Sequence, residues 1–194
     1  MYDDEFELTF DLSDEDKASR APEPEQEPVQ EAAPEPAAET EPPVEAVPEP
    51  AVPAANGRCV LISGGDRGIG AAAARAFWQA GYRVAVLYHT HAEAAAALEK
   101  ELPGLLAVQC DVASRASCEV AFHTVEQAVG HVDVLVSNAG IAQQKLFTDI
   151  TPEEWQHMLD VNLSGAFHLC QLALPGMIRR KAGRILTVSS MWGQ

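Results

Sequence analysis

A glycine-rich segment near the middle of the chain has the residue types and spacing of a phosphate-binding loop. Its glycines follow the spacing Gly64-x-x-x-Gly68-x-Gly70, after the apolar run 59–62 and before the alanine-rich run 71–80. Backbone amides and the positive end of a helix dipole favour an anion, and glycines let a diphosphate approach the main chain. A tight turn without a ligand is the alternative. The segment is predicted to bind the diphosphate of a dinucleotide through Ser63, Gly64, Asp66, Arg67, Gly68, Ile69 and Gly70.

The residues after the expected second strand bear on which dinucleotide is bound. Proteins that bind NAD place an acidic residue at this strand end, where it hydrogen-bonds the ribose 2′-hydroxyl. Residues 87–91 contain no acid, whereas Arg67 supplies a cation that suits a 2′-phosphate. Both features favour NADP (NADPH), while the neighbouring Asp66 weakens the local positive field. The alternative is that Arg67 is an exposed loop arginine with no ligand.

Further candidate residues follow the later apolar runs or lie inside a helical pattern. Those that follow apolar runs are Asp111, Val112, Asn138, Ala139, Gly140 and Ser190. Asn162 lies within a helical pattern, where asparagine is a poor helix former. Each of these residues could instead have a purely structural role, because turns after strands and helix caps use the same residue types.

Alternating strands and helices over residues 57–194 must position these side chains. Five apolar runs predict strands buried on both faces, at residues 58–63, 83–88, 105–110, 132–137 and 183–189. Helices are expected at 69–80, 91–102, 114–129 and 152–180, the last with a break near Pro175. Thr151 and Ser114 are the expected caps of the fourth and third helices. This alternation predicts an α/β fold with a Rossmann-type, doubly wound parallel sheet.

Residues 58–194 resemble the short-chain dehydrogenase/reductases, especially the 3-oxoacyl-[acyl-carrier-protein] reductases. The resemblance rests on the glycine loop, Asp111, the run 137–140, Asn162 and Ser190, which occur in this order. Two positions depart from the family's usual residues: Ser63 replaces a threonine and Ser137 replaces an asparagine.

The resemblance implies a role for each candidate. In the family, the aspartate hydrogen-bonds adenine with help from the next backbone unit, here Asp111 and Val112. The asparagine that matches Asn138 braces the central sheet, and Ala139 and Gly140 would pass close to the cofactor ribose. The catalytic candidates are Asn162, which would distort its helix and hold a water of the proton relay, and Ser190, which would hydrogen-bond the substrate carbonyl.

One family motif is missing from the sequence. The family reduces carbonyl groups with a Tyr-x-x-x-Lys pair, in which the lysine lowers the pKa of the tyrosine. The pair would fall beyond Gln194, and Tyr2, Tyr82 and Tyr88 cannot replace it by their order in the chain. We therefore expect the chain as given to be inactive on its own, with a sheet that is incomplete at its C-terminal end and a fifth strand at an exposed edge.

The first 56 residues differ in composition from the rest. They hold 17 of the 29 acidic residues, 2 of the 13 basic residues and 10 of the 13 prolines. Such a segment buries too little apolar surface to offset its ordering entropy, so we expect a disordered acidic, proline-rich tail before a domain at 57–194. Apolar residues alternate with polar ones over residues 1–12, which predicts either a strand that pairs with a protein partner or a solvated terminus.

Composition also argues against several functional classes. An acidic arm and a net charge of −16 argue against nucleic-acid binding. No apolar run is long enough to cross a membrane and no secretory signal is visible, so a cytoplasmic location is expected. The four cysteines are dispersed, which suits a reducing compartment, and His89 and His91 lack a third ligand, so no metal site is expected.

These features predict an NADPH-dependent oxidoreductase that reduces a ketone to a secondary alcohol, of the 3-oxoacyl-[acyl-carrier-protein] reductase type. Its partners would be an acyl-carrier-protein-bound or other carbonyl substrate, and a second copy of the chain in a full-length homo-oligomer. One alternative is a reductase of a ketone modification on elongation factor P, suggested by residues 139–147 and 191–194. A second is a non-catalytic half-domain that binds a nucleotide or a partner.

Overall fold

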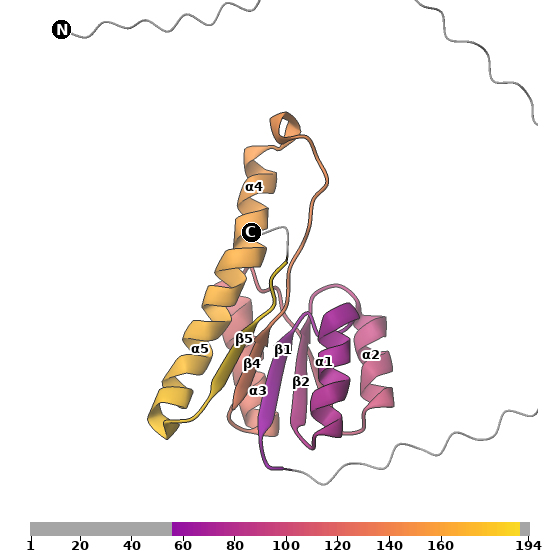
Figure 1. Ribbon diagram of the computed structural model, residues 1–194, viewed down its shortest axis with the longest axis vertical. Helices are drawn as coiled ribbons and strands as arrows, with labels where there is room; N and C mark the ends of the chain where they lie inside the picture. Colours follow the sequence, from indigo (N-terminus) through magenta and orange to yellow (C-terminus); the bar gives the residue numbers. More distant parts are fainter. Residues whose placement is uncertain (1–55, 191–194) are drawn as a thin grey trace, which may run out of the picture. The chain divides into compact units, whose positions relative to one another are not determined.

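The computed structural model describes residues 56–190, and these residues form a five-stranded parallel sheet (Figure 1). The sheet contains β1 (Cys59–Ser63), β2 (Arg83–Tyr88), β3 (Leu106–Gln109), β4 (Val134–Ser137) and β5 (Arg184–Thr187). The strand order is β3-β2-β1-β4-β5, and every neighbouring pair is parallel. The predicted doubly wound α/β fold is confirmed.

Helices cover both faces of this sheet (Figure 1). On one face, α1 (Gly68–Gln79) lies over β1 and β2 and α2 (Ala92–Glu101) lies over β2 and β3, in a core that includes Val60 and Ile62. On the other face, α3 (Arg115–Val129) lies over β2 and β3 and α5 (Gly165–Arg180) lies over β4 and β5, in a core that includes Leu61. Because alternate residues of a strand point to opposite faces, each long apolar run of a central strand fills two cores at once.

The prediction that the strands are buried on both faces is wrong for β3, whereas the exposed edge expected of the fifth strand is found at β5. Every residue of β1 and β4 is buried. By contrast, no residue of β3 or β5 is fully buried. These two strands lie at the edges of the sheet, where each has a strand neighbour on one side only.

The region expected to form one helix over residues 152–180 is helical throughout but changes its pitch. It begins with α4 (Pro152–Leu159), continues through a π-helical turn, η2 (Asp160–Ser164), and ends with α5. The expected break near Pro175 is wrong, because Pro175 lies inside α5. The irregularity lies instead around Asn162, as the family resemblance implied.

Both predicted helix caps are confirmed. The Ser114 side chain accepts a hydrogen bond from the Ser117 amide at 3.3 Å. Thr151 and Glu154 form a capping box, in which each side chain accepts from the other residue's backbone amide. These caps fix where α3 and α4 begin.

Two further observations concern the described part of the chain. Among residues 56–190, no helix is both long and apolar enough to cross a bilayer. The expected acidic tail, apart from Asn56, and the strand pairing expected of residues 1–12 lie outside the described residues.

Candidate cofactor-binding site

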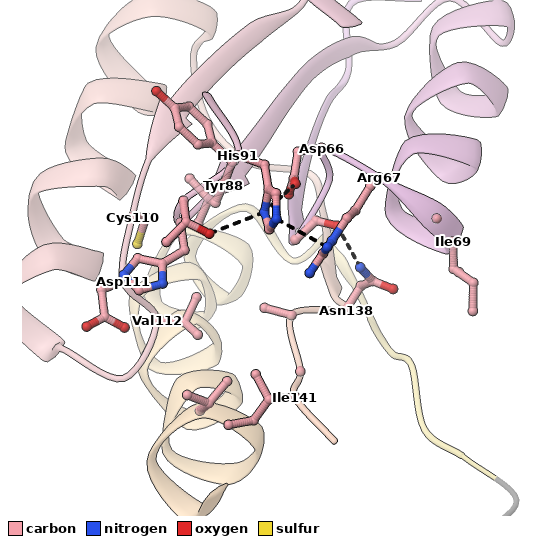
Figure 2. Close-up of a pocket in the computed structure, with 18 of the residues that line it drawn as sticks. Asp66, Arg67, Ile69, Tyr88, His91, Cys110, Asp111, Val112, Asn138 and Ile141 are labelled. Atoms are coloured by element: carbon pink, nitrogen blue, oxygen red, sulfur yellow. Dashed lines mark hydrogen bonds and ion pairs between the residues drawn. The ribbon is translucent and has the colours of Figure 1, made fainter. Parts of the chain in front are cut away.

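A cavity of about 370 Å³ opens at the C-terminal ends of the central strands (Figure 2). It lies where the strand order reverses, between β1 and β4, which is the usual ligand position in open α/β sheets. Ten residues expected to bind the cofactor line it: Gly64, Asp66, Arg67, Gly68, Ile69, Asp111, Val112, Asn138, Ala139 and Gly140. The structure therefore brings together residues from three separate segments of the chain.

Two expected binding residues, Ser63 and Gly70, lie behind the cavity wall instead of lining it. The Ser63 hydroxyl oxygen accepts hydrogen bonds from the backbone amides of Asn138 and Ala139, both at 3.0 Å. A Cβ atom added to Gly70 would lie 2.1 Å from the carbonyl oxygen of Gly64. Both residues therefore shape the loop, and their contact with a cofactor stays a prediction.

The glycine loop has room for a phosphate group. Gly64 and Gly68 have φ angles of +60° and +53°, in the left-handed region that favours glycine. A Cβ at Gly68 would meet no atom within 4 Å, so the main chain there faces open space. The first-turn amides of α1 have no acceptor inside the helix, and they begin at this glycine. These features fit the diphosphate of a dinucleotide.

Asn138 ties the end of β4 to the end of β1. Its Nδ2 atom donates hydrogen bonds to the carbonyl oxygens of Ser63, at 3.0 Å, and Gly64, at 2.9 Å. The side chain thereby holds the start of the glycine loop in place, in agreement with the bracing role expected of it.

Asp111 both lines the cavity and stabilises a turn. Its Oδ1 atom accepts a hydrogen bond from the Ala113 amide at 3.0 Å, and its own amide donates to the Ser117 hydroxyl at 3.0 Å. Asp111 therefore acts as a turn residue, which was the structural alternative to a cofactor contact. The adenine contact stays a prediction, with Asp111 and Val112 in the cavity wall (Figure 2).

The two catalytic candidates lie outside the cavity lining. Asn162 clamps the segment after β4: its Oδ1 accepts from the Ile141 amide at 2.9 Å, and its Nδ2 donates to the Ile141 carbonyl at 3.1 Å. Ser190 lies in the segment after β5 and is exposed. The proton relay and the carbonyl contact remain predictions.

Several cavity residues were not predicted from the sequence. They are Leu87, Tyr88, His89, Thr90, His91, Cys110, Ile141, His157 and Val161. The position of residues 87–91 at the C-terminal end of β2 was a usable signal, because a ribose contact is expected there. Nothing in the sequence pattern points to His157, which reaches the cavity from α4.

Two thiols meet at the cavity wall. The Sγ atoms of Cys110 and Cys118 are 3.9 Å apart, and both residues are buried free cysteines. The hydrogen bond with Cys110, together with burial, holds the pKa of the Cys118 thiol well above its usual value. Burial likewise raises the pKa of the Cys59 thiol, in β1, to about 11. The thiols of Cys118 and Cys59 are therefore protonated, poorly nucleophilic core groups at neutral pH.

Comparisons with known proteins agree with this architecture. An acetoacetyl-CoA reductase of Rhizobium meliloti is 42% identical over 137 residues, which cover 71% of this chain and 56% of the relative. The 3-oxoacyl-[acyl-carrier-protein] reductase MabA of Mycobacterium avium is 40% identical over 144 residues, which cover 73% of this chain and 53% of that protein. The chain thus spans about half the length of the curated relatives it matches.

A solved structure and a family model support the same assignment. The crystal structure of gox2181 matches with a TM-score of 0.65 and 33% sequence identity, over 70% of this chain and 55% of that one. The family model described as short chain dehydrogenase matches residues 58–194. The protein belongs to the short-chain dehydrogenase family of oxidoreductases, and it resembles the 3-oxoacyl-[acyl-carrier-protein] reductases within that family.

Proposed function

We propose that residues 57–194 form the NADP-binding portion of a reductase that converts a ketone into a secondary alcohol. The supporting observation is the cavity, where the glycine loop and Arg67 face a β2 end that carries no acid. An acid there would repel a 2′-phosphate, whereas an arginine binds it with charge-assisted hydrogen bonds. When bound, NADPH supplies the hydride for the reduction.

The proposed substrate is a 3-oxoacyl thioester. The similar proteins are acetoacetyl-CoA reductases and 3-oxoacyl-[acyl-carrier-protein] reductases. A thioester on coenzyme A or on acyl carrier protein is therefore the carbonyl compound to test first. We also propose a reducing compartment, which is supported by the four free cysteines of the described residues.

The roles proposed for the two catalytic candidates rest on the family resemblance. We assign Asn162 to the proton relay and Ser190 to the substrate carbonyl, as in the family they resemble. The 194 residues contain no Tyr-x-x-x-Lys sequence. These residues on their own are therefore proposed to bind the cofactor without turning over a substrate.

A fluorescence titration of the 194-residue chain with NADPH tests cofactor binding. Arg67→Glu should raise the Kd at least about tenfold, because it removes a charge-assisted contact to the 2′-phosphate and adds a like charge. Arg179→Glu makes the same charge change at an exposed position of α5 and should leave the Kd unchanged. Equal effects of the two variants, or no binding by the wild type, would contradict the NADP assignment.

An assay of acetoacetyl-CoA reduction tests the catalytic part of the proposal. NADPH absorbance should stay constant in the presence of acetoacetyl-CoA and the 194-residue chain. Turnover would show that the chain contains its own proton donor, and the missing tyrosine would then have a replacement among the residues present.

A further inference from the structure

Two buried thiols are in contact at one side of the cavity. Cys110, the residue after β3, lines the cavity together with Asp111 and Val112 (Figure 2). Cys118 lies near the start of α3 and is completely buried. The Sγ atoms of the two cysteines are 3.9 Å apart, although the residues are eight positions apart in the sequence. The two side chains therefore point toward each other, which a disulfide requires.

A small movement is enough to join the two sulfur atoms. They would have to approach by roughly 1.9 Å, because a disulfide bond is about 2.05 Å long. The Cys110 amide donates to the Tyr88 carbonyl at 2.8 Å, and the Cys118 amide donates to the Ser114 carbonyl at 3.0 Å. These anchors hold the backbone of both cysteines, so the turn over residues 111–114 is the part that adjusts when the sulfur atoms approach.

The same turn forms part of the cavity wall and depends on Cys118. The Sγ atom of Cys118 lies 3.5 Å from the carbonyl oxygen of Val112 and 3.8 Å from that of Asp111. The Asp111 amide donates to the Ser117 hydroxyl at 3.0 Å, which also ties the turn to the start of α3. A disulfide would remove the Cys118 thiol proton, and the turn would lose this donor.

Cys110 is the more reactive thiol of the pair. The hydrogen bond with the Cys118 thiol holds the pKa of Cys110 below its usual value; burial opposes this effect, and the Ser117 hydroxyl adds to it. The pKa of Cys118 is shifted the other way. The thiolate is the nucleophilic form of a cysteine, and Cys110 is also the member of the pair that lines the cavity. A small molecule that enters the cavity therefore meets Cys110 first.

We propose that Cys110 and Cys118 form a reversible disulfide when a peroxide enters the cavity, and that this disulfide weakens cofactor binding. The formation of the bond is inferred from the two thiols alone, whereas its effect on the cofactor rests on the proposed NADP binding. A transient disulfide of this kind is compatible with a reducing compartment, where redox-sensing cysteines are reduced at rest.

The reaction proceeds in two steps. The Cys110 thiolate attacks one oxygen of hydrogen peroxide, the O–O bond breaks, and the sulfur becomes a sulfenic acid, oxidised by two electrons. The hydroxide that leaves takes a proton from the solvent and becomes water. The Cys118 sulfur then attacks the Cys110 sulfur, the S–O bond breaks, and the hydroxide leaves as water with the Cys118 proton. A dithiol reductant returns two electrons and two protons and restores both thiols.

Oxidation of Cys110 favours the second step. The pKa of Cys118 is high first because of its hydrogen bond with Cys110 and then because of burial. A sulfenic acid at Cys110 carries no thiolate charge for the Cys118 proton to stabilise, so that first cause is lost. The contact between the two sulfur atoms also makes the attack intramolecular, which raises its rate over that of an external thiol. Cys118 is therefore the resolving thiol.

Thiol counting on the 194-residue chain tests the bond. The chain is treated with hydrogen peroxide, freed of excess oxidant, denatured in urea and alkylated with N-ethylmaleimide before mass spectrometry. The reduced chain has four cysteines to label, whereas the oxidised chain should be labelled at Cys59 and Cys170 only. Peptide mapping should find Cys110 linked to Cys118 of the same chain. Labels on all four cysteines, or a bond to Cys59, Cys170 or a second chain, would overturn the proposal.

Serine variants test the role of each thiol. Cys118→Ser keeps a donor for the Val112 carbonyl but cannot form the disulfide, so dimedone should trap a sulfenic acid on Cys110. Cys110→Ser should give neither a dimedone adduct nor a disulfide. Cys170→Ser is the matched control, because it removes a free cysteine of α5 that does not line the cavity, and it should still form the disulfide. A dimedone adduct on Cys118 in Cys110→Ser would contradict the assigned roles. Circular dichroism establishes that each variant is folded, and peptide mapping of the wild type decides the bond without them.

Fluorescence titration with NADPH tests the effect on the cofactor. Oxidation should raise the Kd of the wild type about fivefold or more, because the turn loses a hydrogen-bond donor, and dithiothreitol should restore it. The Kd of Cys110→Ser should be the same before and after peroxide treatment. Bound NADP⁺ should slow disulfide formation in the wild type, because it covers Cys110.

The outcomes separate this inference from the proposed function. A disulfide that leaves the Kd for NADPH unchanged would overturn the control of the cofactor site and leave the NADP assignment intact. Failure of the reduced chain to bind NADPH would overturn the proposed function, while thiol counting would still decide whether Cys110 and Cys118 form a disulfide. A mapped disulfide together with a reversible rise in Kd that Cys110→Ser lacks would establish the inference.

Discussion

Asn138 joins two strand ends that are 74 residues apart in the sequence. Its side-chain amide donates to the carbonyls of Ser63 and Gly64, and its backbone amide donates to the Ser63 hydroxyl. The side chain is partly buried, so a lost donor leaves two carbonyl groups that water reaches poorly. The geometry of the glycine loop therefore depends on one side chain outside the loop.

Asn138→Ala should lower the free energy of unfolding by about 2 kcal/mol, because it removes two hydrogen bonds and leaves their acceptors unsatisfied. Urea denaturation of the full chain measures this difference. The same variant should weaken NADPH binding, because the loop that faces the phosphates is no longer held.

Asn56→Ala is a matched control for this substitution. Asn56 also bonds two backbone groups, the carbonyl of Ala80 and the amide of Arg58, but its contacts are exposed. Its loss should cost less than about 1 kcal/mol and should not affect NADPH binding. If the two variants destabilise the chain equally, Asn138 is not a brace.

At the scale of single elements, α4 has the most complete set of start signals among the helices of residues 56–190. Thr151 accepts from the Glu154 amide at 3.2 Å, Glu154 accepts from the Thr151 amide at 2.9 Å, and proline is the first helical residue. Lys145 also donates to the Glu154 carboxylate, at 2.8 Å. This hydrogen bond, with the Thr151 amide, holds the pKa of Glu154 below its usual value.

Thr151→Ala should lower the free energy of unfolding by about 1 kcal/mol, because a helix amide loses its cap. Thr124→Ala is the control, since Thr124 lies in the interior of α3 on an exposed face and donates to the Val120 carbonyl. Alanine is the better helix former at such a position, so this control should change stability by less than about 0.5 kcal/mol. If Thr151→Ala changes the free energy of unfolding as little as the control does, the capping box does not stabilise the start of α4. Thermal unfolding at neutral pH provides the comparison.

The elements show which features a sequence can predict. The caps at Ser114 and Thr151 and the central strands were predicted, because they depend on local residue types and on continuous apolar runs. The shift in helix pitch at Asn162 was not predicted from local propensity, which pointed to Pro175. The two hydrogen bonds of Asn162 go to Ile141, 21 residues away, and local pattern carries no information about such a contact.

The same limit applies to the site. The glycine loop was predicted because its spacing and neighbouring runs form one continuous signal. His91 was considered only as a possible metal ligand, since its contacts with Asp66 and Arg67 exist only after β1 and β2 pair side by side. The exposed character of β3 likewise depends on strand order, which its own apolar run does not encode, whereas an exposed edge at the fifth strand was expected.

At the scale of the whole molecule, several large apolar side chains of the described part are open to solvent, and two groups of them lie on regular elements of the fold. One is the edge of β5, where Leu186 is 45% exposed. The other is a stripe on α5 formed by Phe167, Leu174 and Ile178, which are 58%, 41% and 68% exposed. Their spacing of seven and four residues places them on one face of the helix. Both surfaces are candidates for self-association.

We expect the α5 stripe to be the surface through which two copies of the chain associate. It is formed by large side chains on a regular helix, which pack against a second copy without any change in backbone pairing. The wild type should therefore be a dimer in size-exclusion chromatography with light scattering, and Phe167→Glu combined with Ile178→Glu should be a monomer. Val120→Glu, on an equally exposed position of α3, should leave the mass unchanged.

Leu186→Lys blocks the β5 edge and should not change the mass if the stripe is the interface. If Leu186→Lys alone yields the monomer, the chain associates through its sheet edge and the α5 stripe is not the contact.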